Sequence, residues 1–345
     1  MTAEAEREER DGGHEAERLP AAAVGALRAK ASGILEAAWR ELPGGEGFCV
    51  PHAITYPWQW LWDSCFHAVV WARLGDERAG RELRSALADQ DDDGFVPHLR
   101  YASGANPHAA LWGRPSTSSI TQPPMYGHAL AELVREGMAP ADDLVERARL
   151  GLRFLLERRH RSPGGLIELC HPWESGCDDS PRWDGVLDGA WTPELWFQAK
   201  GDLLLSIERS TAGAPLRNPA FPVASVGFNA LVAFNALELA AVTGDASLER
   251  AAGELVSALD ARWDPSLVTW RDDGSTEATS GAVRTLDALL PLLVSPRRAA
   301  FEQLSDERAF AAPCGPRAPE TTRRVVNDSK PPLMSWLPRR PVVRK

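Results

Sequence analysis

The segment 171–184 (HPWESGCDDSPRWD) brings together residue types that could act on a carbohydrate. It holds the carboxylates of Glu174, Asp178, Asp179 and Asp184 beside the indoles of Trp173 and Trp183. A carboxyl group held against aromatic walls has a raised pKa, so it can keep a proton near neutral pH and donate it. Indole faces stack on the C–H faces of sugar rings, and carboxylates bind hydroxyl groups at the rim. The segment therefore indicates a sugar site that contains a general acid.

Asp178 is the favoured acid among these four carboxylates. It lies two residues after Gly176, with Trp173 close before it and an Arg-Trp pair after it. A lone aspartate in a loop is usually solvated, and this remains the alternative for each of the four. We interpret Arg182 as a structural ion-pair partner of Asp184.

Two further segments carry groups that suit a sugar site. In 56–67 (YPWQWLWDSCFH), three indoles at every second position precede Asp63, which we expect at the N-cap of a helix. A cap with a hydrophobic staple is the alternative, but it does not explain three indoles. The polar loop 114–124 ends in Gln122-Pro-Pro, where Gln122 could donate to a hydroxyl or simply precede a proline-defined helix start.

No metal or nucleotide cofactor is expected. Residues 89–94 match the first half of a calcium-binding EF-hand loop, but the twelfth position is Arg100 and not a glutamate. The histidines form no HxH or HExxH pattern, so zinc is not indicated. Walker A, GxGxxG and GxSxG stretches are also missing from the sequence.

Composition limits the class of partner. The 345 residues carry a net charge of −10, which argues against nucleic acid or an anionic membrane surface as the main partner. The five cysteines have no metal-binding spacing, and the charged N-terminus lacks the apolar core of a signal peptide, so we expect reduced thiols in a cytoplasmic protein. No apolar run reaches the roughly 18 residues of a membrane span. Oligomeric state cannot be inferred.

The hydrophobic pattern predicts an all-α chain. Helical periodicity covers 22–40, 64–74, 77–88, 126–136, 141–159, 192–208, 226–243, 247–263, 281–294 and 296–304. Alternating short and long connections suit a toroid of helical hairpins, with an irregular helical bundle as the alternative. We expect three regions: a disordered acidic tail (1–20), a helical domain (21–312) and a basic Pro/Arg-rich tail (313–345) without apolar period.

The segments 56–67, 91–101, 119–124 and 171–184 resemble glycoside hydrolase family 63 and its neighbours, which include the trehalases. The string ESGCDDSPRWD is similar to a signature of the bacterial mannosylglycerate and glucosylglycerate hydrolases. This resemblance implies an (α/α)6 barrel and inverting hydrolysis of an α-glycosidic bond between a hexose and glycerate, a compatible solute. It makes Asp178 the general acid. It also implies that the sugar subsite is lined by Tyr56, Trp60, Asp63, Gln122, Trp173 and Gly176.

The C-terminal region departs from that family. The resemblance implies a general base, a glutamate within an aromatic-rich stretch of the last hairpins, but here the only acids of the basic tail are Glu320 and Asp328. Ten predicted helices also fall short of the twelve that close such a barrel. We therefore expect an incomplete barrel without its base, as a frameshift would produce. The alternatives are a sugar-binding protein without turnover and an interaction protein that uses 331–341 as a polyproline ligand.

Overall fold

The computed structural model describes residues 19–102, 104–187, 191–274, 284–307 and 309–311. The chain divides into two compact units, residues 1–37 and residues 38–345. The described part of the first unit is helix α2 (Ala21–Ala38), which runs into the second. The expected acidic tail lies almost entirely, and the expected Pro/Arg-rich tail entirely, outside the described residues.

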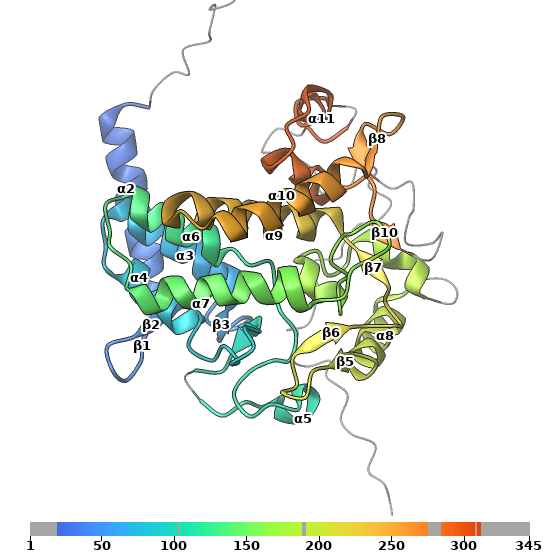
Figure 1. The fold of residues 1–345 in the computed structure, drawn as a ribbon. Helices are drawn as coiled ribbons and strands as arrows, with labels where there is room; N and C mark the ends of the chain where they lie inside the picture. Colours follow the sequence, from blue (N-terminus) through green and yellow to red (C-terminus); the bar gives the residue numbers. More distant parts are fainter. Residues whose placement is uncertain (1–18, 103, 188–190, 275–283, 308, 312–345) are drawn as a thin grey trace, which may run out of the picture. The chain divides into compact units, whose positions relative to one another are not determined.

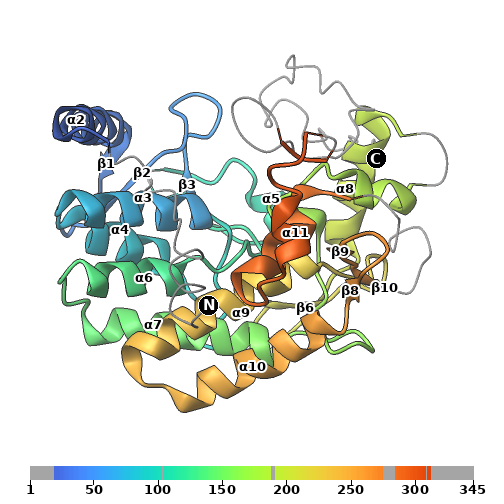
Figure 2. The same ribbon diagram turned by 90° about the horizontal axis from the view of Figure 1, so that it is seen from above.

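Three helical hairpins form the frame of the second unit. They are α3 (Leu61–Leu74) with α4 (Arg78–Ala86), α6 (Tyr126–Arg135) with α7 (Asp142–Arg153), and α9 (Val226–Thr243) with α10 (Ala246–Asp260). Helix α3 ends at Gly75, whose φ of 77° suits a left-handed C-cap that only glycine adopts without strain. Helix α6 packs against both α3 and α9, and α9 and α10 run side by side (Figures 1 and 2).

Shorter elements fill the connections between these hairpins. The helical ones are α5 (Ala109–Trp112), the π-helix η1 (Phe154–Arg158), the 3₁₀ helices η2 (Pro172–Ser175), η3 (Pro181–Val186) and η4 (Leu286–Leu293), α8 (Pro193–Leu205) and α11 (Arg298–Glu302). The strands form two-stranded antiparallel ribbons: β1 (Trp39–Glu41) with β2 (Gly47–Cys49), β3 (Gln59–Trp60) with β4 (Leu99–Arg100), β5 (Glu208–Arg209) with β6 (Pro215–Arg217), β7 (Val223–Ala224) with β10 (Asp273–Gly274), and β8 (Trp263–Asp264) with β9 (Thr269–Trp270). A helix-rich chain with little strand is thereby confirmed.

Most predicted helices exist, with shifted ends. The span 226–243 is correct, whereas the predicted helix 281–294 is a 3₁₀ segment over Leu286–Leu293, partly because Pro291 lies inside it. The position expected for Asp63 is wrong. Helix α3 begins at Leu61 with Trp60 as its N-cap, so Asp63 lies in the first turn. The apolar Leu61 is buried and extends the helix toward its N-terminus.

Helix α9 is a largely buried helix of the core. It is long and apolar enough to cross a membrane, but 67 % of its apolar stretch is buried inside the structure, as in the core helix of a soluble protein. Ser225 caps it by accepting the N–H of Phe228 at 3.4 Å.

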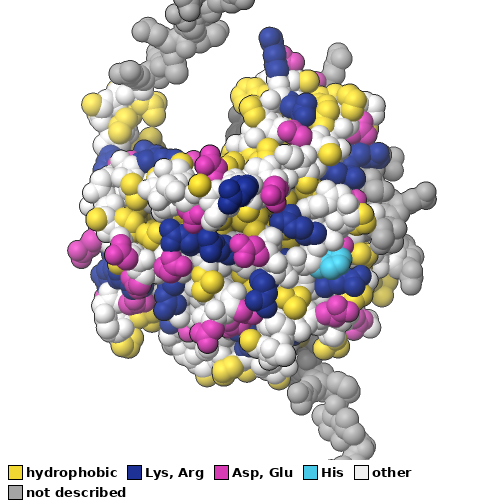
Figure 3. All heavy atoms as spheres, in the orientation of Figure 1, with side chains coloured by type: hydrophobic (Ala, Val, Ile, Leu, Met, Phe, Trp, Pro, Cys, Tyr) yellow, Lys and Arg dark blue, Asp and Glu magenta, His cyan; other side chains and the backbone are white. Residues whose placement is uncertain are grey.

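Charges of both signs are interspersed on the face shown in Figure 3, which includes α7 and α10. Ion pairs such as Arg149–Asp245 (2.8 Å) join these two helices there.

Candidate active site

A cavity of about 490 Å³ opens among the loops at one end of α3. Its walls include all seven residues selected from the sequence: Tyr56, Trp60, Asp63, Gln122, Trp173, Gly176 and Asp178. The seven residues come from three segments that lie far apart in the sequence, and the fold brings these segments together around one cavity. Four indoles and two carboxylates line the space, a composition that suits a sugar.

The β3–β4 ribbon and the start of α3 position the first group of side chains. Trp60 pairs with Leu99, and the N–H of Leu61 donates to the carbonyl of His98 at 2.9 Å. Tyr56 packs edge-on against Trp60, with ring centroids 5.7 Å apart. Asp63 then projects from the first turn of α3, and its burial raises the pKa of the carboxyl group.

Gln122 is fixed by its contact with the start of α3. Its side-chain oxygen accepts the backbone N–H of Trp62 at 3.4 Å, which leaves the NH₂ group as the part that can donate into the cavity. The preceding residue, Thr121, donates its N–H to the Glu174 carboxylate at 3.2 Å. The Gln122 loop is therefore attached to the segment that carries the candidate acid.

Glu174 is a fully buried structural carboxylate and does not line the cavity. It forms an ion pair with Arg159 at 2.7 Å, and neither side chain is exposed to solvent. It also accepts the backbone N–H of Cys170 at 2.7 Å. Arg159 directly follows the π-helix η1. Since a buried charge needs a partner, this pair explains why a glutamate stands here without a role in proton transfer.

Asp178 is the carboxylate of the signature segment that lines the cavity. It lies between η2 and η3, and its chain neighbours are anchored on both sides. The carbonyl of Cys177 accepts the indole N–H of Trp183 at 2.7 Å. The Asp179 carboxylate accepts from Lys200 Nζ and from the indole of Trp196 on α8, each at 2.9 Å.

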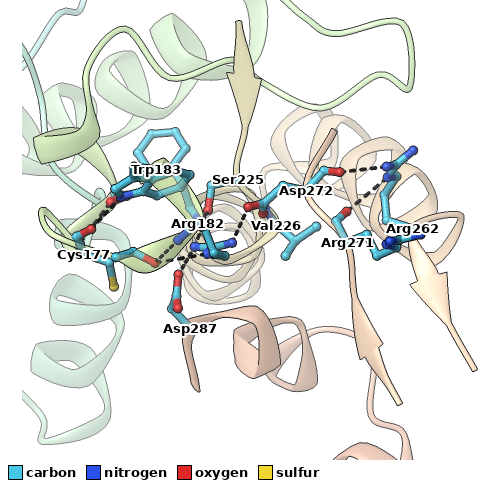
Figure 4. A network of polar contacts seen from close by, with 12 residues as sticks. Cys177, Arg182, Trp183, Ser225, Val226, Arg262, Arg271, Asp272 and Asp287 are labelled. Atoms are coloured by element: carbon cyan, nitrogen blue, oxygen red, sulfur yellow. Dashed lines mark hydrogen bonds and ion pairs between the residues drawn. The ribbon is translucent and has the colours of Figure 1, made fainter. Parts of the chain in front are cut away.

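Arg182 ties the same segment to distant parts of the chain (Figure 4). Its guanidinium forms ion pairs with Asp272 and Asp287, whereas the sequence had suggested Asp184. Asp272 in turn accepts the N–H of Val226, the first residue of α9, at 2.9 Å. The partners of Arg182 lie 90 and 105 residues away in sequence, which is why local spacing did not reveal them.

Gly176 has a steric reason to be glycine. Its φ is 73°, and a Cβ atom placed on it would lie 2.3 Å from the ring of Trp62. A larger residue would both strain the backbone and push this indole into the cavity.

Two donors in the cavity wall have no partner of their own. The indole N–H groups of Trp60 and Trp173 are buried and make no hydrogen bond to any described residue. Buried polar groups are nearly always satisfied in native proteins. Protein atoms cover both nitrogens, so these N–H groups do not face the open space of the cavity.

Sequence reasoning missed part of the wall, which His98, Tyr101, His108 and Trp112 complete. His98 donates from Nδ1 to the carbonyl oxygen of Ile120 (3.3 Å), and burial lowers its pKa to about 3, so the ring is neutral at physiological pH. The segment 91–101, which contains His98 and Tyr101, was already noted for its resemblance and could have given this signal.

Two clusters outside the cavity have the residue types of a metal site: Cys49, His67 and Glu82, and His128, Glu132 and Glu238. Ligand atoms of Cys49, His67 and Glu82 lie within 4.8 Å of one another. Glu82, however, accepts hydrogen bonds from the Cys49 backbone, from His67 Nδ1 (both 3.0 Å) and from the Trp71 indole at 3.1 Å. These contacts account for the buried carboxylate, and we assign no metal to it.

Comparison of the chain with known proteins identifies a family. The sequence profile of the mannosylglycerate hydrolase MGH1-like glycoside hydrolase domain covers residues 56–324. The chain belongs to this glycoside hydrolase family. All seven cavity residues selected from the sequence lie within the matched range, so the resemblance seen in the sequence is confirmed at the level of the family.

Individual relatives are similar over part of their length. A mannosylglycerate hydrolase from Thermus thermophilus is 38% identical over 161 residues, which cover 41% of this chain and 37% of that protein. A glucosylglycerate hydrolase from Mycolicibacterium hassiacum is 36% identical over 157 residues, which cover 39% of this chain and 35% of that protein. The chain thus spans about a third of the length of the curated relatives that it matches.

A solved structure gives wider coverage. The GH63 mannosylglycerate hydrolase from Thermus thermophilus, in complex with Tris and D-glycerate, superposes with a TM-score of 0.65 and 26% identity over 86% of this chain and 80% of that chain. The described helices therefore have the arrangement of a GH63 enzyme over most of the chain.

Proposed function

We propose that this chain is a glycoside hydrolase of the inverting α-glycosidase type, acting on a small sugar-glycerate such as mannosylglycerate or glucosylglycerate. The observation that carries the proposal is the cavity of about 490 Å³ whose walls combine four indoles with the carboxylates of Asp63 and Asp178. Hydroxyl groups of a hexose would donate to the Asp63 carboxylate, and the C–H faces of the sugar would stack on the indoles. Family membership supports the same substrate class.

Asp178 is the general acid in this proposal. It lines the cavity, and the anchors on Cys177 and Asp179 hold the backbone on either side of it. Protonation of the glycosidic oxygen by such a group lowers the barrier to departure of the aglycone. Asp63, Gln122 and Tyr56 would orient the sugar, with the indoles of Trp60 and Trp173 as its walls and Gly176 keeping Trp62 out of its space.

Inversion also requires a base that activates water from the opposite face of the sugar, roughly 6.5–9.5 Å from the acid. Among the described residues that line the cavity, the carboxylates are Asp63 and Asp178. We propose that the helical hairpins form an (α/α)6 barrel that is incomplete at its C-terminal end, so that this base is missing. The second candidate function follows directly: a carbohydrate-binding protein of the same family without turnover.

The remaining features of the proposal concern its setting. The acidic composition favours a small-molecule substrate over nucleic acid or a membrane surface, and the cysteine usage favours the cytoplasm. The domain limits expected from the sequence, 1–20, 21–312 and 313–345, belong to the same proposal.

The test is an assay of glucose and mannose release from the two sugar-glycerates, together with calorimetric titration of glucose. Release that Asp178→Asn reduces by about 10²-fold or more would establish the enzyme and its acid, and the first-formed anomer, read by NMR, would report inversion. Saturable binding without release would favour the binding protein. If the chain neither binds glucose nor releases a sugar, both candidate functions are excluded.

A further inference from the structure

A hydrogen-bonded chain of three side chains forms one wall of the cavity. The indole of Trp112 donates to the hydroxyl oxygen of Tyr101 at 3.0 Å, and that hydroxyl lies 3.1 Å from Nδ1 of His108. Trp58 packs edge-on against both Tyr101 and His108, at 5.2 and 5.8 Å between ring centroids. Tyr101 and Trp112 are buried, whereas the partly exposed ring of His108 lines the cavity.

This chain sets the tautomer of His108. An indole can only donate, so the Tyr101 oxygen accepts from Trp112 and its own proton points to His108 Nδ1. Burial raises the pKa of Tyr101 to about 12, so the hydroxyl keeps that proton at physiological pH. The neutral ring of His108 then carries its proton on Nε2, on the side away from Tyr101. Nε2 is thus a directed donor.

The same chain also accommodates a charged His108. If Nδ1 gains a proton, it donates to the Tyr101 oxygen, and the hydroxyl proton of Tyr101 turns away from His108. The backbone N–H of His108 is held separately by Asn106 at 2.8 Å and is unaffected. The Tyr101 oxygen can therefore bond either a neutral or a charged His108, and the charged form gives up the hydrogen bond that the Tyr101 hydroxyl donates.

The rest of the cavity wall has little positive charge to offer. Its other ionisable groups are His52, Tyr56, Asp63, His98 and Asp178, and no lysine or arginine belongs to the described lining. His98 is neutral, and His52 stands at the exposed rim, where Nδ1 accepts two backbone N–H groups at 3.0 and 3.3 Å. His108 is the remaining group within the wall that can gain a positive charge.

We propose that His108 recognises a carboxylate on the aglycone of the ligand and takes up a proton when that carboxylate binds. The proposal rests on the sugar-glycerate function proposed above and assigns the residue that meets the carboxylate of the glycerate. A single titratable ring matches a monoanion, whereas a phosphate dianion would face two carboxylates with only one compensating charge.

Proton uptake gives the inference a measurable sign. Desolvation lowers the pKa of His108 below its ordinary 6.5, so the ring is mostly neutral at pH 7 without ligand. A bound carboxylate favours the charged ring and raises that pKa. Affinity for an anionic ligand must then increase as the pH falls, by up to about tenfold per pH unit within the window between the two pKa values. The affinity for a neutral ligand should not increase in this way as the pH falls.

The experiment compares an acid with its neutral counterpart. Thioglycoside analogues of glucosylglycerate and glucosylglycerol, which resist hydrolysis, are titrated calorimetrically at pH 5.5 and pH 8, in two buffers that differ in ionisation enthalpy. For the wild-type chain we expect the preference for the acid to grow several-fold at the lower pH, with proton uptake on binding. In His108→Gln, which keeps an N–H donor but cannot be protonated, the proton uptake and the pH dependence should disappear.

The matched control is His128→Gln. His128 bonds Glu238 at 3.0 Å, does not line the cavity, and its loss should leave the wild-type pattern intact. Proton uptake that persists in His108→Gln would overturn the inference. Equal binding of acid and neutral ligand by the wild-type chain would overturn it while leaving the sugar site standing. Binding of neither ligand would overturn both.

Discussion

At the scale of single residues, the ionised carboxylate of Asp63 in the cavity wall lowers the stability of the fold. Asp63 is held in the first turn of α3, where burial raises the pKa of its carboxyl above the ordinary 3.8. A raised pKa means that the folded state holds the proton to higher pH than the unfolded chain does. Ionisation of Asp63 therefore opposes folding, and the opposition appears as the pH rises above 3.8.

Asp63→Asn should accordingly stabilise the protein while weakening sugar binding. We expect a higher free energy of unfolding than that of the wild-type chain at pH 7, with the difference shrinking as the pH falls toward 3.8. Glucose affinity should fall by about tenfold or more, because a hydrogen bond to a charged acceptor is lost. Urea denaturation at several pH values and calorimetric titration check the two effects. A variant less stable than wild type at pH 7 would mean that the carboxylate has a structural role.

Loss of the Glu174 carboxylate should destabilise the protein, in contrast to loss of the Asp63 carboxylate. Glu174→Ala leaves the Arg159 guanidinium buried without its counter-charge, together with the backbone N–H groups of Thr121 and Cys170. Breaking a buried pair in this way typically costs about 3–5 kcal/mol. Urea denaturation at pH 7 gives the value. Glu302→Ala, which removes an exposed i,i+4 pair with Arg298, is the control and should cost less than about 0.5 kcal/mol. Similar losses in both variants would contradict this account.

At the scale of elements, helix α10 depends on one charged cap. Asp245 accepts the N–H groups of Ser247 and Leu248 with one oxygen, both at 3.0 Å, and binds Arg149 of α7 with the other. The hydrogen bond from the Ser247 hydroxyl, followed by these other contacts, lowers the pKa of Asp245 to about 2. The carboxylate therefore stabilises the fold above the unfolded pKa of 3.8, and this contribution is lost as the pH falls from 3.8 toward 2.

Asp245→Ala should cost about 1–2 kcal/mol at pH 7, the usual range for loss of an N-cap. The difference in free energy of unfolding between Asp245→Ala and the wild-type chain should decrease as the pH falls from 3.8 toward 2. Asp245→Asn keeps the acceptor oxygen and should lose less. The measurement is the free energy of unfolding at pH 7, 5 and 3.5, and a difference that does not change with pH would contradict the assigned role of the charge.

The helices themselves were predictable because the apolar period is local. The 226–243 span of α9 was correct for this reason. The start of α3 was not predictable, and Asp63 is not its N-cap. Leu61 is buried when it joins the helix, and this burial depends on tertiary contacts that the local sequence does not specify.

Local motifs in the sequence pointed to residues that line the cavity, but not to the side chains that hold those motifs in place. Asp178 and its neighbours stand in one contiguous segment. The charge partners of Glu174 and Arg182 lie outside it, up to 105 residues away for Arg182, and no local pattern specifies them.

At the scale of the whole molecule, Arg182 links the signature segment to the C-terminal half. Arg182→Met would leave the buried Asp272 carboxylate and the nearly buried Asp287 carboxylate without their shared counter-charge. We expect a loss of about 3–5 kcal/mol at pH 7 and a weakened glucose affinity, measured by urea denaturation and calorimetry. Arg182→Lys should recover part of the stability. Unchanged affinity in a destabilised Arg182→Met would show that the clamp supports the fold without positioning the site.

This clamp also sets an order of events during synthesis. All seven cavity residues selected from the sequence have been translated once Asp178 has left the ribosome, yet Arg182 must wait for Asp287 before both of its counter-charges exist. Roughly a hundred codons separate the two, several seconds at about 5–20 residues per second. Through that interval the nascent chain carries all seven residues of the proposed site, while Arg182 still lacks one of its two ion-pair partners and the segment around Asp178 is not yet fixed.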